Sequence, residues 1–181
     1  MKTKFLYCVV APSGSGKDRV IDTLCKQYEL TKVLSYTTRK PRKDEENTHM
    51  FVSQKGFNDI KNKLIAYDNY QGNDYGATEE QADNSNIYII NVNGIKWFKQ
   101  NYHGDIKIKI IYLDVPTTER RMRMIKRGDD KEDINKRIET DKKEFKDAKE
   151  LADVIIPNKY FFSCVGDIWE YIRKCEGVNN K

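Results

Sequence analysis

The chain has 181 residues, which is enough for one domain with a sizeable core. Charged residues make up 34% and aromatic residues 11%, a composition typical of a folded protein rather than a disordered one. The net charge of +5 comes from mixed residues of both signs, so we expect no nucleic-acid partner. No apolar run is long enough to span a bilayer, so we expect no membrane association. Four cysteines without a Cys-x-x-Cys pair indicate a reduced, cytoplasmic protein without structural zinc.

The first predicted element is a strand that leads into a glycine-rich loop. Residues 6–11 form a continuous apolar run, as expected for a parallel strand covered on both faces. The loop APSGSGKD follows at residues 11–18, and apolar residues at helical spacing then predict a helix. This is the context of the phosphate-binding pattern G-x-x-x-x-G-K-[ST], although Ala11 replaces the first glycine and Asp18 replaces the hydroxyl residue.

The next segment breaks the alternation of strands and helices. We expect a short strand that ends near Ser35, a polar loop, a strand within residues 48–53, and a short helix capped by Ser53. Residues 64–78 contain two β-rich pieces around Gly72-Asn73, which predicts a hairpin. Residues 36–79 are therefore predicted to form a small inserted β-rich unit.

The rest of the chain returns to alternating elements. Residues 86–94 and 106–115 are predicted as strands, and the lysines early in the second indicate a sheet edge or an exposed start. Residues 116–151 predict two helices that meet near residues 127–130, followed by a last strand at 152–158 and a closing helix. This alternation favours an α/β fold with a parallel sheet and helices on both faces.

The glycine loop has the chemistry to bind a nucleoside triphosphate. Consecutive backbone N–H groups form an anion nest, and the following helix adds its positive end. We expect the phosphates of ATP to contact Ser13, Gly14, Ser15, Gly16, Lys17 and Asp18. The Asp18 carboxylate is a hard oxygen ligand suited to Mg²⁺. Alternatively, Asp18 only favours the start of the helix electrostatically.

Four motifs, in order, resemble those of the guanylate kinase family. The segment SYTTRKPRKDEEN at 35–47 resembles S-x-T-T-R-x-P-R-x-G-E-x-N, and QGNDYGAT at 71–78 resembles G-N-x-Y-G-[ST]. The segment RMIKRGDDKEDINKRI at 123–138 is similar to the family's lid, and DVIIPN at 153–158 to its late D-x-x-x-x-N strand. The order and spacing hold over about residues 4–172, which makes the combination far more specific than any single motif.

The resemblance implies transfer of the γ-phosphoryl group of ATP to a nucleoside monophosphate, with Mg²⁺ as cofactor. It also implies a P-loop kinase fold within a single domain over residues 1–181. This fold has a parallel core sheet, a helical lid over residues 116–138 and a small monophosphate-binding subdomain over residues 36–79. The expected partners are small-molecule nucleotides, and the oligomeric state stays open.

The resemblance assigns roles to individual side chains on both sides of the transferred group. The acceptor side is expected to contain Ser35, Arg39, Arg42, His49 and Tyr75, where His49 stands in place of a family tyrosine. The lid arginines expected to close over the transferring group are Arg123, Arg127 and Arg137, which with Lys17 and Arg39 form the expected catalytic set. Arg120 and Arg121 are expected to lie on a solvated face.

The departures from the family pattern concentrate on the base. Ala66 stands where the family has its guanine-reading glutamate, Ala77 where it has a hydroxyl residue, and Asn91 and Asn93 where it has acidic residues. If residues 65–70 are extended, Asp68 lies on the same face as Ala66, because side chains alternate along a strand. We therefore expect Asp68 and Asn93 to contribute to an altered base site, the alternative being that Asp68 is an exposed loop charge.

Three functions remain in competition at this point. The favoured one is a nucleoside or deoxynucleoside monophosphate kinase, with GMP or dGMP as first candidates and a base preference that is relaxed or altered. The second is a non-catalytic module that binds phosphorylated partners through Arg39, Arg42 and Tyr75. The third is a kinase of a phosphorylated sugar, which the loss of the base-reading carboxylate motivates.

Overall fold

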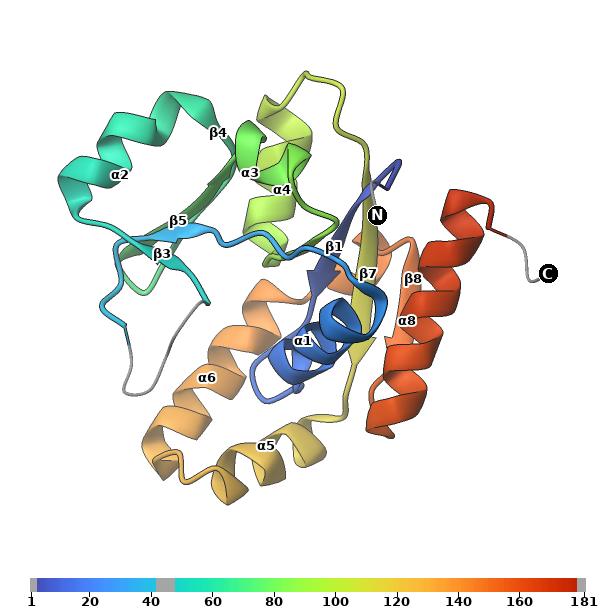
Figure 1. Ribbon diagram of the computed structural model, residues 1–181. Coiled ribbons are helices and arrows are strands. Elements are labelled where there is room, and N and C mark those ends of the chain that lie inside the picture. Colours follow the sequence, from blue (N-terminus) through green and yellow to red (C-terminus); the bar gives the residue numbers. More distant parts are fainter. Residues whose placement is uncertain (1–2, 42–47, 179–181) are drawn as a thin grey trace.

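The core of the protein is a parallel sheet, as the alternation of elements predicted. The computed structural model describes residues 3–41 and 48–178 (Figure 1). The strand order is β6-β1-β7-β8, and every neighbouring pair is parallel. The strands are β6 (Ile87–Ile89), β1 (Leu6–Val10), β7 (Ile108–Asp114) and β8 (Val154–Pro157).

Helices cover both faces of this sheet. Strand β1 is buried along its whole length, so its side chains alternate between two cores. Tyr7 and Val9 pack against α1 (Lys17–Tyr28) and α8 (Phe161–Glu176). Cys8 and Val10 pack on the other face with α4 (Val92–Asn101) and α7 (Ala148–Leu151). The result is a doubly wound α/β layer structure. No helix in the described part of the chain is long and apolar enough to cross a bilayer.

Strand β7 lies inside the sheet, which corrects the expectation of an edge strand. It pairs with β1 on one side and β8 on the other. The early lysines are accommodated at its start, where Lys107 is exposed and Lys109 Nζ lies 3.1 Å from Asp153 Oδ1. The alternative reading, an exposed start, was therefore the correct one.

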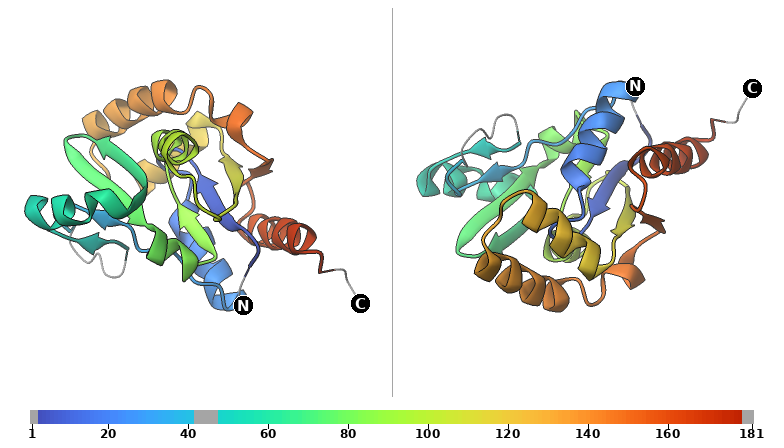
Figure 2. Two further views of the ribbon diagram at one scale, coloured as in Figure 1. Left: turned by 90° about the horizontal axis from the view of Figure 1, so that it is seen from above. Right: turned by 90° about the horizontal axis from the view of Figure 1, so that it is seen from below.

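A second sheet lies beside the core, within residues 36–78 (Figure 2). Its order is β3-β2-β5-β4, with β3 (Met50–Phe51), β2 (Tyr36–Thr37), β5 (Asn73–Thr78) and β4 (Leu64–Tyr70). The predicted hairpin is confirmed, but its turn is Gln71-Gly72, one residue earlier than the expected Gly72-Asn73, with φ of 51° and 76°. The strand expected to end near Ser35 is reduced to an isolated parallel bridge between Lys32 and Ile87 of the core sheet. The regular pairing begins later, at Tyr36–Thr37, where the chain joins β3 and β5 of the second sheet.

Two helices that were not predicted follow the second sheet in the chain. Helix α3 (Glu79–Asp83) follows β5 and is capped by Thr78, and α4 follows β6 and is capped by Asn91. The signal for α4 was present, because Val92, Ile95 and Phe98 recur at helical spacing and are buried. The predicted cap at Ser53 is confirmed: its hydroxyl accepts from the Gly56 N–H at the start of α2 (Gln54–Ile60), which continues as a 3₁₀ turn over Lys61–Lys63.

The two helices predicted for residues 116–151 are present as a hairpin, and the short helix α7 at the end of this range was not predicted. Helix α5 (Thr117–Lys126) and α6 (Lys131–Glu144) meet at Gly128, whose φ of 87° permits the sharp turn. Asp130 caps α6 by accepting from the N–H groups of Glu132 and Asp133. In Figure 1 this hairpin lies below the glycine loop and reaches towards the second sheet.

Candidate active site

The glycine loop connects β1 to α1 at the carboxyl end of the parallel sheet. Gly14 and Gly16 have φ of 75° and 81°, in the left-handed region that glycine adopts without strain. A Cβ on Gly14 would lie 2.7 Å from the backbone oxygen of Arg120, so α5 packs directly against the loop. The loop therefore requires glycine at position 14 for its conformation and for its neighbour.

Lys17 and Asp18 begin α1 and form an ion pair, with 3.4 Å between Lys17 Nζ and Asp18 Oδ2. Desolvation by neighbouring atoms opposes ionisation of Asp18. The charge and hydrogen bond of Lys17 outweigh it, however, and keep the pKa of Asp18 below its usual value. The Asp18 side chain is 70% exposed. An ionised, exposed carboxylate beside a phosphate loop suits Mg²⁺, which typically binds through one or two carboxylates plus substrate phosphates.

Arg123 holds the loop through its backbone. Its Nη1 donates to the Ser15 carbonyl at 2.7 Å, and its Nη2 donates to the Asn158 carbonyl at 2.7 Å and to Glu119 Oε1 at 2.6 Å. The Asn158 side chain, which is buried, also donates to the Ser15 carbonyl at 2.7 Å. Sequence reasoning placed Arg123 over the transferring group and gave Asn158 no role, whereas in this structure both side chains hold the loop.

Arg120 corrects a sequence expectation. It was expected on a solvated face, but it is 5% exposed and its Nη1 lies 2.8 Å from Asp141 Oδ2. The same Nη1 donates to the Ser13 carbonyl at 3.0 Å. Asp141 in turn accepts from the Ser13 N–H at 2.9 Å. Arg121 keeps partial exposure and donates to Asn135. No motif contained Arg120 or Asp141, because the two residues meet only when the hairpin folds.

Arg127 and Arg137, the remaining predicted lid arginines, share one carboxylate. Arg127 donates to both oxygens of Asp129, at 2.8 and 2.5 Å, and Arg137 Nη1 donates to Asp129 Oδ2 at 3.3 Å. The hydrogen bonds that Arg127 donates to Asp129 raise the pKa of Arg127, and the charge of Asp18 adds to this effect. The tip of the hairpin therefore lies within electrostatic range of the glycine loop.

The predicted acceptor residues gather on the second sheet. Ser35 Oγ lies 2.9 Å from His49 Nδ1, and the His49 ring meets the Tyr75 ring edge to face at 5.7 Å between centroids. Arg39 lies on the adjoining loop, with its guanidinium 5.4 Å from the centroid of the Phe51 ring. Arg42 lies outside the described residues.

The positions predicted to read the base lie on β4, on β5 and at the start of α4. Ala66 and Ala77 face each other across the β4–β5 pair, and both are buried in the core. Asp68 is 8% exposed on β4, so the reading as an exposed loop charge is wrong. Its Oδ2 accepts a short hydrogen bond from Asn91 Nδ2, and within the described residues no hydrogen bond reaches its Oδ1. Asn93 lies exposed in the first turn of α4 and makes no such contact with Asp68 among the described residues.

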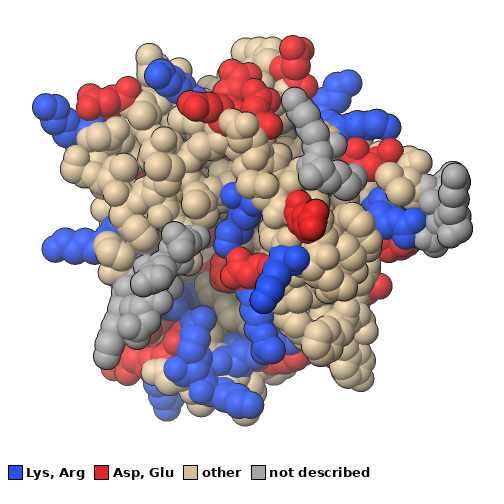
Figure 3. Space-filling view, viewed as in Figure 1, with Lys and Arg blue, Asp and Glu red and all other residues tan. Residues whose placement is uncertain are grey.

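Helix α6 brings the hairpin to the second sheet. Burial raises the pKa of Tyr70, carboxylates of Glu144 and Asp141 add to this, and Arg137 opposes it. Burial also raises the pKa of Glu144 to about 7, with contributions from the charges of Asp68 and Asp141. Figure 3 shows a hollow in the middle of this face, with blue Lys and Arg side chains and red Asp and Glu side chains around it.

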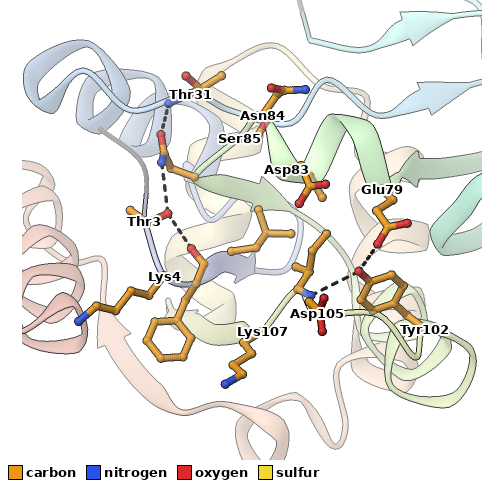
Figure 4. Close-up of a pocket in the computed structure, with 15 residues that line it drawn as sticks. Thr3, Lys4, Thr31, Glu79, Asp83, Asn84, Ser85, Tyr102, Asp105 and Lys107 are labelled. Atoms are coloured by element: carbon orange, nitrogen blue, oxygen red, sulfur yellow. Dashed lines mark hydrogen bonds between the residues drawn. The ribbon is translucent and has the colours of Figure 1, made fainter.

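A separate cavity lies away from these residues. It has a volume of about 610 Å³ and is lined by residues that precede β1, β6 and β7, at the amino edge of the parallel sheet (Figure 4). Tyr102 donates a short hydrogen bond to Glu79 there. The cavity contains none of the predicted site residues, so we assign the candidate active site to the open hollow around the glycine loop.

The fold and site define the class of P-loop kinases that act on nucleoside monophosphates. A family model described as guanylate kinase matches residues 3–175. A guanylate kinase of Porphyromonas gingivalis is 32% identical over 93% of this chain and 94% of its own length. One of Geobacter metallireducens is 31% identical over 90% of this chain and 85% of its own.

The fold itself also has a counterpart among solved structures. A crystal structure of guanylate kinase from Anaplasma phagocytophilum superposes with a TM-score of 0.69 at 22% identity, covering 97% of this chain and 88% of that one. At this identity the likeness concerns the fold alone. The family model and the two relatives show that this chain belongs to the guanylate kinase family, a family of ATP-dependent phosphotransferases.

Proposed function

We propose that this chain transfers the γ-phosphoryl group of ATP to a nucleoside monophosphate, with GMP and dGMP as the first candidate acceptors. One observation carries the proposal. Helix α6 joins the three parts that such a reaction needs, because its Asp141 contacts Ser13 of the glycine loop, its Arg137 holds the hairpin tip, and its charged side chains lie within electrostatic range of Tyr70 on the second sheet. In this proposal residues 36–79 bind the acceptor, and residues 116–138 form the lid.

The ATP side is supported by the conformation of the loop. Its backbone N–H groups and the start of α1 attract the triphosphate, and Lys17 leaves Asp18 to contact the β- and γ-phosphates. The buried Ser15 hydroxyl has no hydrogen-bond partner within the described residues. Such an orphaned donor is costly, and a loop that adjusts to bound phosphate can satisfy it.

Asp18 would hold the Mg²⁺ that accompanies ATP. One ionised carboxylate, completed by phosphate oxygens and water, is sufficient for this metal. When bound, the ion neutralises charge on the β- and γ-phosphates. Within the described residues no cluster of three or more His, Cys, Asp or Glu side chains offers an all-protein site. The metal site therefore depends on the nucleotide.

The acceptor side is supported by the arginine and aromatic side chains of the second sheet. Arg39, Arg42 and Tyr75, with Ser35 and His49 beside them, would bind the acceptor phosphate through charge-assisted hydrogen bonds. Arg127 and Arg137 would leave Asp129 for the transferring group and exclude water from it, while Arg123 keeps the loop in place. An acceptor oxygen then bonds to the γ-phosphorus as the bond to the bridging oxygen of ADP breaks. Positioning and charge stabilisation suffice for this step.

Asp68 would read the base together with Asn91, with Asn93 at the rim. The carboxylate is buried, and Asn91 orients it through one oxygen, which leaves Oδ1 to accept from a base N–H. This arrangement replaces the missing carboxylate at position 66 from a neighbouring position on the same strand.

The four free thiols suit a reducing compartment such as the cytoplasm.

The test measures ADP release from Mg-ATP against GMP, dGMP, AMP, CMP, UMP, dTMP and several sugar phosphates. We expect turnover with at least one nucleotide and a loss of about 10²–10³-fold in kcat for Lys17→Ala. Asp68→Asn should raise the KM of the preferred acceptor about 10- to 100-fold, as removal of a charged hydrogen bond predicts. Asp74→Asn is the matched control. Asp74 belongs to the same sheet, and within the described residues its buried carboxylate accepts hydrogen bonds only from Gln54, Tyr67 and Asn69.

Two results would contradict the proposal. Turnover of a sugar phosphate but of no nucleotide would move the acceptor to another class of substrate. Turnover of no acceptor by a folded protein, or full activity in Lys17→Ala, would remove the assignment of the glycine loop as the catalytic site.

A further inference from the structure

We propose that the buried ion pair between Arg120 and Asp141 is a positioning device that holds the glycine loop in its ATP-binding conformation by pinning Ser13 to the lid hairpin. The inference rests on the proposed function for its substrate, but it concerns two residues that lie outside every recognised motif. Neither residue touches ATP in this account, because both act through Ser13.

Every polar group of Ser13 forms a hydrogen bond with this pair. The Ser13 N–H donates to Asp141 Oδ2 at 2.9 Å, and the Ser13 hydroxyl donates to Asp141 Oδ1 at 3.2 Å. The Ser13 carbonyl accepts from Arg120 Nη1 at 3.0 Å. Arg120 Nη1 and Asp141 Oδ2 are 2.8 Å apart. Ser13 is thus clamped from both sides by residues 107 and 128 positions away in sequence.

The Arg120–Asp141 pair is shielded from solvent, and its geometry is fixed by a further hydrogen bond. The side chains of Arg120 and Asp141 are 6% and 4% exposed, and a hydrogen bond from Arg120 Nη2 to Thr117 at 3.2 Å fixes the guanidinium. Arg120 Nε is buried without a partner within the described residues. A buried pair of this kind is weak evidence for stability, because an apolar pair of similar size often serves the fold equally well. Its position against the loop points to a role beyond stability.

The electrostatic arrangement also suits an anion site. The Asp141 carboxylate accepts a hydrogen bond from a backbone N–H of the loop. Without the charge of Arg120, this carboxylate would repel a bound triphosphate. Arg120 neutralises that charge at 2.8 Å, so the loop keeps its conformation without a net negative neighbour. Because Arg137 lies one helical turn before Asp141 on α6, the same pair ties the orientation of the lid to the loop.

The test compares three variants by calorimetric binding of Mg-ATP, steady-state kinetics and thermal unfolding. In Arg120→Met/Asp141→Leu, we expect a melting temperature within a few degrees of the original protein and an ATP Kd and KM raised about tenfold. This loss is close to that of one charge-assisted hydrogen bond, and the acceptor KM should stay within about twofold.

The single variants give the second signature. Arg120→Met leaves the carboxylate unpaired against the loop, so it should weaken ATP binding more than the double variant. Asp141→Leu leaves a positive charge there and should weaken it least. Both single variants should unfold at lower temperature than the double variant, so ATP affinity and stability follow different orders. Glu176→Leu, which removes a buried carboxylate bonded to Tyr7 and Lys4, should lower stability without changing the KM for ATP.

An unchanged ATP Kd in the double variant, or ATP affinity that simply follows melting temperature through the series, would overturn the inference. The proposed function fails separately, if the original protein binds Mg-ATP but phosphorylates no nucleotide. In that case the ordering of ATP affinities among the three variants still decides whether the pair positions the loop.

Discussion

Glu144 makes the stability of this protein depend on pH in a predictable direction. The carboxyl lies at the end of α6, where burial and the charges of Asp68 and Asp141 raise its pKa from 4.5 to about 7. The folded state therefore favours the protonated form. The contribution of this carboxyl to the free energy of unfolding is fully present below pH 4.5 and is lost as the pH rises through 7. Replacing Glu144 by Gln imitates the protonated form at every pH.

The size of the effect follows from the two pKa values. At about 1.36 kcal/mol per pH unit, the interval between 4.5 and 7 corresponds to roughly 3 kcal/mol at most. The side chain is partly exposed, so solvent screening reduces this, and we expect about 1 kcal/mol. Glu144→Gln should therefore match the original protein at pH 4 and melt about 2–4 °C higher at pH 8.

The assay is thermal unfolding of both proteins at pH 4, 5, 6, 7 and 8, followed by circular dichroism. Glu139→Gln is the control on the same helix, because Glu139 is exposed and its hydrogen bond with Lys142 lowers its pKa. It should show no gain at pH 8. A gain in Glu144→Gln that is the same at pH 4 and pH 8, or no gain at all, would refute the account of three interacting carboxylates.

Two further predictions follow from the loop and the lid. Gly14→Ala should destabilise the protein by about 2–4 kcal/mol and weaken ATP binding, because it combines positive φ with a Cβ 2.7 Å from the Arg120 oxygen. Gly128→Ala, where φ is 87° and the added Cβ has no neighbour within 4 Å in the described residues, should cost only about 1 kcal/mol, and equal losses would contradict the clash. Asp129→Asn removes the charge of a carboxylate, 15% exposed, that Arg127 and Arg137 share, so the KM for ATP should fall about two- to fivefold. A higher KM would instead mean that Asp129 orients them.

The sequence by itself determined the elements that depend on interactions between residues close together in the chain. The apolar run of β1 leads into a glycine loop, the turn at Gln71-Gly72 joins two β-rich pieces, and two helical patterns meet at Gly128. In each case the backbone preferences and side-chain periodicity of a short segment agree with the final fold, so the prediction needed no distant partner.

The tertiary structure decided what depends on distant partners. Strand β7 is central because β8 pairs with it, and Asp68 is buried because Asn91 packs on it from another strand–helix unit. The residues next to Arg120 in the sequence do not distinguish it from an arginine on the surface. It is buried because Asp141, 21 residues later, and Ser13, 107 residues earlier, surround it once the hairpin closes on the loop. A charged side chain is buried only where such partners compensate its lost hydration, and their arrival depends on the whole fold.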